Sequence, residues 1–451
     1  LFMSYHRAIP VIFMILLIAF PLCSGTWERT FGGIYWDGAG SVKQTSDSGF
    51  IISGYTASYG VSQDGLYLIK IDLNGYVEWI NVYGGLACGG RSVQQTEDYG
   101  YISVGSCWNE NYYCIKTDSL GDSVWANEYG TNYQDIAYAI CKTFDGGYII
   151  AGRTRANGDR IYVVRINSIG DTLWTRFYGS GYSEGRAIKK TIDGNYIVTG
   201  FLRINLDLRN IYLIKIDSYG DTIWTKYYGG NISCEGYDID QTNDGGYVVI
   251  GSILLKTDSL GDSLWAKPIS GIAGQQTSDG GFIILSTVGT YPATDIGITK
   301  TDSQGNIQWE QVFGGDSAEY ASSIQQVYDG GYIIAGETYS FGEGRSDVYV
   351  IKTDSMGLVG VEEEQVNENN GSSVFCSSIG GNQIHFEFEL QKQGQVNLGI
   401  YDLSGRLIST PLNGLFSSGR HQIDVNLPGS GMYFYEFNSV DFKQKGKIII
   451  L

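Results

Sequence analysis

Short runs of alternating apolar and polar residues, separated by turns rich in glycine and aspartate, fill most of the chain. One stretch shows the pattern clearly, with runs at 186–191, 196–200, 211–217 and 222–228. Alternation with a period of two residues is typical of β-strands, and the Asp-Gly-Asn and Asp-Ser-Tyr-Gly-Asp segments between the runs favour tight turns. The pattern recurs roughly every 50 residues, as propeller blades do. Each repeat therefore predicts a four-stranded antiparallel sheet.

The same unit occurs seven times. The turn between its first two strands carries an aspartate in every copy: Asp47, Asp98, Asp145, Asp193, Asp244, Asp279 and Asp329. Its fourth strand carries a tryptophan: Trp27, Trp79, Trp125, Trp174, Trp224, Trp265 and Trp309. Trp27 precedes the first complete unit, and the seventh unit has Val361 where the tryptophan should stand. A closed ring explains this displacement, because the first strand then completes the last sheet and hides its edge. We predict an all-β fold with a seven-bladed β-propeller at residues 26–358.

Two further columns repeat in every unit. One position of the first strand holds only alanine or glycine: Ala39, Gly90, Ala137, Gly185, Gly236, Gly271 and Ala321. One position of the third strand is basic: Lys70, Lys116, Arg165, Lys215, Lys256, Lys300 and Lys352. We expect the small residues to relieve crowding of the inner strands around the axis. We expect the basic residues to make polar contacts within their blades; a cationic surface for anionic glycans is the alternative. The tryptophans are expected to fill the space between neighbouring blades.

Charge, the N-terminus and the cysteines narrow the class of protein. The formal net charge of −18 argues against nucleic acid or an anionic membrane as a partner. At the N-terminus, His6 and Arg7 precede the apolar run 8–20. This order predicts a secretory signal peptide at residues 1–25, and we expect no membrane span after its removal. Export permits disulfides. Cys107 and Cys114 flank a short hairpin loop, so we expect these two to pair.

The repeats resemble a known class of propeller. The segment Asp258-Ser-Leu-Gly-Asp-Ser-Leu-Trp265, echoed at 118–125 and 217–224, resembles the tryptophan-docking motif of quinoprotein dehydrogenases. That family's motif has one more residue between its aspartate and glycine, and its propellers commonly have eight blades. The resemblance covers most of residues 27–358 and implies a relative in fold, without a cofactor. The repeats are also similar to Asp-Gly-Gly-Tyr repeat propellers of exported bacterial proteins.

A different module follows residues 359–375, which we interpret as a linker. Residues 376–451 include Val396-Asn-Leu-Gly-Ile-Tyr-Asp-Leu-Ser-Gly-Arg-Leu407 and end at Lys443-Gln-Lys-Gly-Lys-Ile-Ile-Ile-Leu451. This part is similar to the C-terminal sorting domain of the type IX secretion system. Its alternation of apolar and polar residues independently predicts a small β-sandwich. The signal peptide predicts Sec export, and the resemblance implies translocation across the outer membrane by the type IX machinery, removal of the tail, and then release or surface attachment.

The candidate chemistry is restricted because residues 26–358 contain no histidine. This excludes Ser-His-Asp and Cys-His catalytic systems and histidine-ligated metal sites. We predict neither a metal nor a cofactor. A single ligand site must break the sevenfold repeat, and the variable connections after the second and fourth strands should emerge on one face. Their aromatic and acidic residues are the candidates for ligand binding: Trp36, Asp37, Trp108, Tyr133, Asp135, Tyr182, Glu184, Glu235, Glu319 and Tyr320.

Aromatic rings and carboxylates around a central depression suit the stacking and hydrogen bonding of sugars, and they also suit a protein partner. We therefore predict an exported, non-catalytic propeller that binds a glycan or a protein at the cell surface or in the medium. The alternative is a glycoside hydrolase or polysaccharide lyase that uses loop carboxylates. A glycosidase needs two carboxylates about 5–9 Å apart, a requirement that only neighbours such as Glu184 and Glu235 could meet.

Overall fold

The computed structural model describes residues 25–59, 65–84, 88–107, 111–156, 158–204, 208–359, 373–380, 383–402, 406–428, 431–440 and 443–450. Throughout these ranges the secondary structure consists of β-strands joined by turns. The predicted signal peptide, most of the predicted linker and Trp108 lie outside the described residues.

Seven four-stranded antiparallel sheets form the larger part of the molecule. The strands of blades one to four are β2 (Asp37–Gln44), β3 (Phe50–Thr56), β4 (Gly65–Ile71), β5 (Val77–Tyr83); β6 (Gly89–Gln95), β7 (Tyr101–Ser106), β8 (Tyr112–Thr117), β9 (Ser123–Tyr129); β10 (Asp135–Lys142), β11 (Tyr148–Thr154), β12 (Arg160–Ile166), β13 (Thr172–Tyr178); and β14 (Ser183–Lys190), β15 (Tyr196–Arg203), β16 (Arg209–Ile216), β17 (Thr222–Tyr228).

The other three blades follow the same order. Their strands are β18 (Gly236–Gln241), β19 (Tyr247–Gly251), β20 (Leu254–Thr257), β21 (Ser263–Lys267); β22 (Ala273–Gln276), β23 (Phe282–Thr290), β24 (Ala293–Thr301), β25 (Ile307–Phe313); and β26 (Glu319–Gln326), β27 (Tyr332–Thr338), β28 (Asp347–Thr353), with β1 (Trp27–Phe31) as the fourth strand of the last blade.

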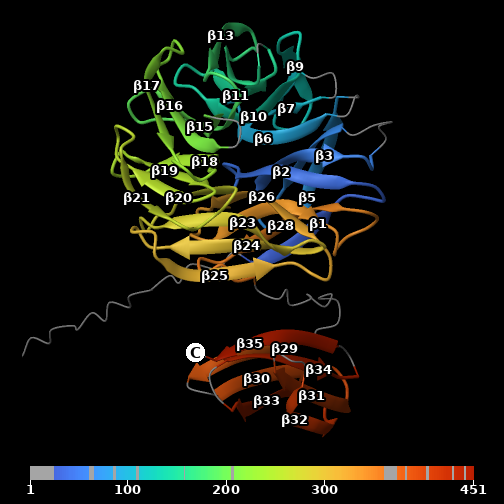
Figure 1. Ribbon diagram of the computed structural model, residues 1–451. Coiled ribbons are helices and arrows are strands. Elements are labelled where there is room, and N and C mark those ends of the chain that lie inside the picture. The colour runs from blue at the N-terminus through green and yellow to red at the C-terminus, as the bar shows by residue number, and fades with distance from the viewer. Residues whose placement is uncertain are drawn as a thin grey trace, which may run out of the picture.

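The sheets close into a ring. The first strand of each blade contacts the first strands of both neighbours, so that β2 lies against β6 and also against β26. Figure 1 shows the chain passing round the ring from blue through green and yellow to orange, where β28 meets β1. Strand β1 pairs antiparallel with β28, with Trp27 opposite Lys352 and Thr30 opposite Tyr349. This confirms the seven-bladed propeller and its completion by the N-terminal strand.

The tryptophan column lies between neighbouring blades, as expected. Trp79 of blade one packs against Gly121 in the last turn of blade two, where an added Cβ would approach its ring to 2.9 Å. The Trp79 Nε1 donates a hydrogen bond to the carbonyl of Ser119 at 3.3 Å, and the ring lies 5.6 Å from that of Tyr101. Each such tryptophan therefore joins two blades.

Every repeated basic side chain pairs with the turn aspartate of its own blade. The seven nitrogen–oxygen distances lie between 2.5 and 3.0 Å, and Lys352 with Asp329 is representative at 2.8 Å. The expectation of polar contacts within each blade is confirmed. The column is part of the scaffold.

The alanine and glycine column is small for a reason different from the one expected. A Cβ added to Gly90 would lie 2.0 Å from the hydroxyl oxygen of Ser53, and one added to Gly236 would lie 2.5 Å from that of Thr199. Both hydroxyls belong to the second strand of the preceding blade. Close packing against the preceding blade therefore demands small residues at Gly90 and Gly236, whereas at Gly271 the closest atom belongs to Ile284 of its own blade.

The expected disulfide between Cys107 and Cys114 is wrong. Cys107 is bonded to Cys88 instead, and Cys114 is a free thiol in the apolar core between blades two and three. The cause is register, because Gly89 pairs with Ser106 and so brings the flanking positions 88 and 107 together. Cys114 is fully buried in the middle of β8, on the side of the core.

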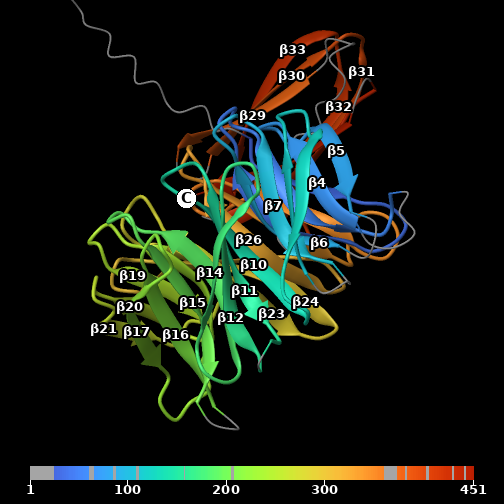
Figure 2. The same cartoon turned by 90° about the horizontal axis from the view of Figure 1, so that it is seen from above.

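The C-terminal strands form two further sheets. One contains β29 (Ser373–Gly380), β30 (Gln383–Leu390) and β33 (Gly419–Asn426); the other contains β32 (Leu407–Phe416), β31 (Gly394–Asp402), β34 (Gly431–Asn438) and β35 (Lys443–Ile450). Phe386 of the first sheet contacts Tyr435 of the second with ring centroids 5.1 Å apart, inside a shared apolar core. The predicted small β-sandwich is confirmed. Figures 1 and 2 show these strands, in orange and red, as a group of their own.

Candidate functional site

The inner strands of six blades carry a β-bulge at the same position. The register shift falls between the flanking residues of the inner strand and leaves one unpaired residue in each: Gly40, Arg91, Tyr138, Arg186, Tyr237 and Ser322. A bulge bends a strand and changes the direction of the extra side chain. The column that follows the alanine and glycine column is therefore placed differently from every other position of the strand.

The glycine that ends the Tyr-Ile-Ile-x-Gly motif explains the bulges. It lies opposite the bulge in all six blades: Gly54, Gly105, Gly152, Gly200, Gly251 and Gly336. An added Cβ at these positions would lie only 1.7–2.2 Å from a carbonyl oxygen of the inner strand. Blade six has Ser286 instead, and the pairing of β22 with β23 begins only at Ala273 and Leu285, so it does not extend to this position. The bulge therefore occurs in each of the six blades that carry the glycine.

The bulge residues meet in a cavity of about 610 Å³ at the centre of the ring. All seven blades contribute to its lining, which includes every bulge residue together with Ile272 from blade six. Tyr55, Ser106 and Glu337 from the second strands complete the polar part of the wall. The bulges lie in the first halves of the inner strands, next to the variable connections. The cavity therefore lies toward the side of the ring that carries the variable connections.

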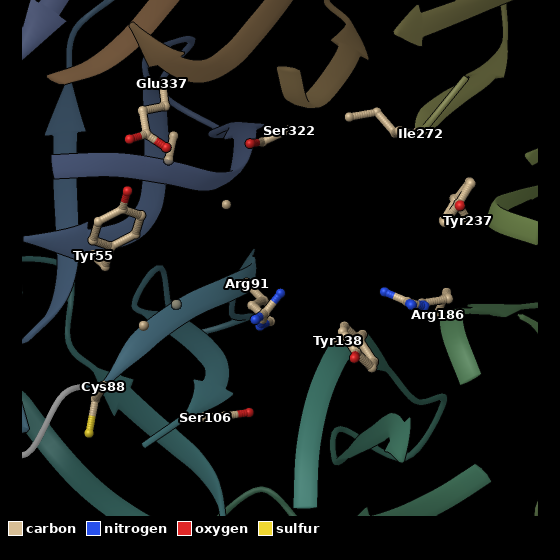
Figure 3. Close-up of a pocket in the computed structure, with 14 residues that line it drawn as sticks. Tyr55, Cys88, Arg91, Ser106, Tyr138, Arg186, Tyr237, Ile272, Ser322 and Glu337 are labelled. Carbon is tan, nitrogen blue, oxygen red and sulfur yellow. The ribbon is translucent and has the colours of Figure 1, made fainter. Parts of the chain in front are cut away.

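One side of the cavity is basic. Arg186 and Arg153 both bind the carboxylate of Glu184, at 2.7 and 2.8 Å, and this carboxylate is 3% exposed. The guanidinium groups of Arg91 and Arg186 lie 5.2 and 4.5 Å from the centre of the Tyr138 ring. Figure 3 shows Arg91 and Arg186 reaching into the cavity near Tyr138. Arg91 is exposed, but partial desolvation by the surrounding atoms, together with the nearby charges of Arg186 and Arg153, lowers its pKa.

The opposite side of the cavity carries a carboxylate. Tyr55 and Glu337 come from blades one and seven, and Figure 3 shows them together, away from the two arginines. Burial, and after it the charge of Glu337, raises the pKa of Tyr55, so its hydroxyl stays protonated. The Oε1 atom of Glu337 is buried and receives no hydrogen bond from the described residues. The cavity thus has a cationic side and an acceptor side.

Three of the acidic candidates support loops. Asp37, Asp135 and Glu319 are fully buried, and none of them lines the cavity. Asp37 accepts hydrogen bonds from the Gly33 amide at 2.8 Å and the Ser58 hydroxyl at 2.6 Å. Asp135 and Glu319 accept the amides of Thr131 and Gly315 in the equivalent loops. These carboxylates hold the connections between blades in place.

The aromatic candidates lie on the rim. Trp36, Tyr133 and Tyr320 have exposed fractions of 43%, 56% and 37%, and none of them lines the cavity. The guanidinium of Arg345 lies 4.0 Å from the centre of the Trp36 ring. Trp108, the remaining aromatic candidate of the connections, lies outside the described residues. The described rim rings are therefore exposed, and Arg345 covers one face of Trp36.

The remaining candidates gather beside the basic side of the cavity. The Tyr182 hydroxyl donates to Glu184 at 3.2 Å, and the Tyr182 ring lies 5.6 Å from the guanidinium of Arg209. Arg209 in turn forms an ion pair with Glu235. Both carboxylates that could have formed a catalytic pair are therefore bound to arginines.

Sequence reasoning missed Arg91, Tyr138, Arg186 and Tyr237. The ligand-binding residues were expected in the variable connections, whereas these four side chains belong to the inner strands. The signal was available, because the position directly after the alanine and glycine column has no common residue type in the seven units. In the part of the chain that the structure describes, no group of His, Cys, Asp or Glu residues is arranged to hold a metal ion. No described helix has the length and hydropathy needed to cross a bilayer.

Comparisons with known proteins identify the tail. Residues 381–451 match the family described as the secretion system C-terminal sorting domain. This domain marks proteins that the type IX system secretes, so the protein interacts with that machinery and reaches the cell surface or the medium. The resemblance of the repeats to quinoprotein dehydrogenases and to Asp-Gly-Gly-Tyr propellers stays a prediction. No curated protein matches the chain.

Among solved structures, Sqt1 from Chaetomium thermophilum has 10% identity and a TM-score of 0.46, with 80% of this chain and 97% of that chain covered. A protein of unknown function from Dyadobacter fermentans DSM 18053 has 10% identity and a TM-score of 0.44, with 72% of this chain and 99% of that chain covered.

Proposed function

We propose that this exported protein is a non-catalytic binding propeller that holds an extracellular glycan in its axial cavity. The observation that carries the proposal is the convergence of the unlike bulge residues of an otherwise regular ring in one cavity of about 610 Å³. Ligand pockets usually have volumes of roughly 300–1,000 Å³. Tyrosine rings, arginines, serines and a carboxylate suit the faces and hydroxyl groups of a sugar. Trp36, Tyr133 and Tyr320 would stack on sugar units that protrude from the cavity.

The state of the carboxylates favours binding over hydrolysis. Asp37, Asp135 and Glu319 accept hydrogen bonds from their own loops, and Glu184 and Glu235 are bound to arginines. A glycosidase needs one carboxylic acid that donates a proton and one free carboxylate. A hydrolase or lyase stays the alternative, and product analysis separates the two.

A glycan array with the purified protein tests the proposal, followed by calorimetric titration of any glycan retained. Tyr237→Ala should weaken binding about tenfold, which corresponds to the loss of about 1.4 kcal/mol. Tyr219→Ala is the matched control, because Tyr219 is an exposed tyrosine in a uniform turn of the opposite face. Tyr133→Ala should have a smaller effect, and only for longer glycans.

Retention of an intact glycan with loss of affinity in Tyr237→Ala would support the proposal. Release of shortened oligosaccharides would support the enzymatic alternative and contradict it. Capture of a protein without any glycan binding would overturn it as well.

A further inference from the structure

The basic side of the axial cavity contains more positive charge than the protein neutralises. Arg153 and Arg186 share the single carboxylate of Glu184. Arg91 stacks near Tyr138, and no described carboxylate lies within ion-pair distance of it. The Nε atoms of Arg153 and Arg186 are also buried without a hydrogen-bond partner. Three guanidinium groups therefore face one carboxylate.

Two of these guanidinium groups are largely withdrawn from water, since the side chains of Arg153 and Arg186 are 13% and 26% exposed, whereas Arg91 is exposed. Buried or confined charges are normally paired, because removing a charge from water is costly unless an opposite charge compensates for it. The chain as a whole has a formal net charge of −18. A cationic pocket in an acidic protein is a local exception. An anion brought by a ligand would supply the missing partner.

The two arginines are placed for one shared group. Arg91 comes from blade two and Arg186 from blade four, and their guanidinium groups lie near the same Tyr138 ring of blade three. Figure 3 shows both side chains pointing into the cavity from different strands. A planar carboxylate or a sulfate ester accepts hydrogen bonds from guanidinium groups in pairs, which an ammonium group cannot reproduce.

The rest of the wall suits the neutral part of a sugar. Glu337 has a buried oxygen without a partner, and Ser322 and Tyr55 lie on the same side of the cavity. A carboxylate accepts hydroxyl groups but repels a second anion, so a densely charged ion such as a polyphosphate fits poorly. The Tyr237 ring, 5.8 Å from the Arg186 guanidinium, offers an apolar face next to the cationic side.

We infer that the ligand is an acidic glycan whose carboxylate or sulfate group binds between Arg91 and Arg186, while its hydroxyl groups face Glu337 and Tyr55. This inference rests on the proposed function, since it names the class of glycan that the same cavity binds. It also assigns the function of the bulges in blades two and four. They direct two arginines of non-adjacent blades toward one anionic group.

The test is titration of the full protein with three oligosaccharides of matched length: a uronate oligomer, a sulfated oligomer and a neutral oligomer. We expect at least about tenfold tighter binding of an acidic oligomer than of the neutral one, with an affinity that decreases as salt increases. Binding of the uronate alone identifies a carboxylate as the bound group, and binding of the sulfated oligomer alone identifies a sulfate. Either result supports the inference.

Arg91→Gln should reduce the affinity for the acidic oligomer about tenfold or more and leave neutral binding unchanged. Arg91→Lys should restore only part of the affinity, because the charge returns without the paired donors. Arg176→Gln is the control, since Arg176 lies on an outer strand over Trp174. Thermal unfolding checks that the variants fold, and Arg91→Gln should not unfold at a lower temperature.

Equal affinity for neutral and acidic oligomers, or an Arg91→Gln variant that keeps the preference, would overturn the inference and leave the proposed function intact. Binding of inorganic sulfate alone, with none of the three oligomers, would contradict both.

Discussion

Two sets of basic side chains differ in a way that separates scaffold from site. The set in the third strands repeats in all seven blades, is 1–9% exposed, and pairs each time with the turn aspartate of the same blade. The set at the axis consists of Arg91, Arg153 and Arg186; the last two share the carboxylate of Glu184, and Arg91 forms no ion pair with a described carboxylate. The repeated set balances its charge within each blade. The axial set does not.

The difference follows from position in the repeat. A charged residue that occurs in every unit must find its ion-pair partner within every unit, because its surroundings are the same each time. A residue that occurs in one unit faces six unlike neighbours across the axis, where nothing in the repeat supplies a partner. In a ring of similar blades, uncompensated charge at an irregular position is therefore better evidence of a ligand than charge at a repeated one.

Gly200→Ala should have the largest effect, because it acts on both stability and ligand binding. The added methyl group would lie 1.8 Å from the carbonyl oxygen of Glu184, so β14 and β15 must separate or lose the bulge that presents Arg186. We expect the free energy of unfolding to fall by about 1–3 kcal/mol. Binding of an acidic glycan should be lost together with the position of Arg186. Chemical denaturation and calorimetric titration measure the two effects.

Blade six provides the control for that variant. Ser286 occupies the position of the repeated glycine, one residue beyond the pairing of β22 with β23, which begins at Ala273 and Leu285. Ser286→Gly should therefore lower the free energy of unfolding by no more than about 1 kcal/mol, the usual cost of glycine in a strand. An equally mild Gly200→Ala variant would show that the bulge does not depend on glycine.

Lys352→Met tests the repeated set and should have the next largest effect. Lys352 is 1% exposed and donates to Asp329 at 2.8 Å and to the carbonyl of Thr353 at 3.0 Å. Loss of these charged hydrogen bonds should lower the free energy of unfolding by about 2 kcal/mol. Arg91→Gln, measured in the same denaturation series, should lower it by much less. A larger loss from Arg91→Gln would remove the distinction between the two sets.

Most of the fold could be predicted from the sequence. The displacement of Trp27 from its unit and the regular turns were enough to predict seven blades and the pairing of the first strand with β28. These features are local or repeated, so each copy confirms the others. The sorting tail could be predicted from its motifs and from its position after the repeats.

The site was predicted only in part, because a bulge breaks the rule used to assign side chains to faces. Side chains alternate between the two faces of a strand, so the sequence assigns Arg91 and Arg186 to the faces that their neighbours imply. One inserted residue changes that assignment. The predicted disulfide of Cys107 was wrong for a related reason. The partner is decided by the strand register, which brings Cys88 opposite Cys107, and not by the short sequence separation from Cys114. Burial of Asp37 and Asp135 also depends on loop geometry that composition does not show.

The smallest expected effect is on the free energy of unfolding at low pH, through the ion pair of Asp145 with Arg165. The hydroxyl of Thr143 and the guanidinium of Arg165, against the opposing effect of burial, lower the pKa of Asp145 to about 2. An unfolded aspartate has a pKa of about 3.9. Because the folded pKa is the lower one, the stabilisation is complete above about pH 4 and is lost as the pH falls through about 2.

The Asp145 side chain is 66% exposed, so solvent screening keeps its contribution below about 1 kcal/mol. Asp145→Asn should reduce the acid-dependent loss of stability between about pH 4 and pH 2, measured as the melting temperature against pH. Binding of an acidic glycan at neutral pH should stay unchanged in this variant. If binding fell while stability did not, the repeated ion pairs would act on the ligand, and repetition would no longer distinguish scaffold from site.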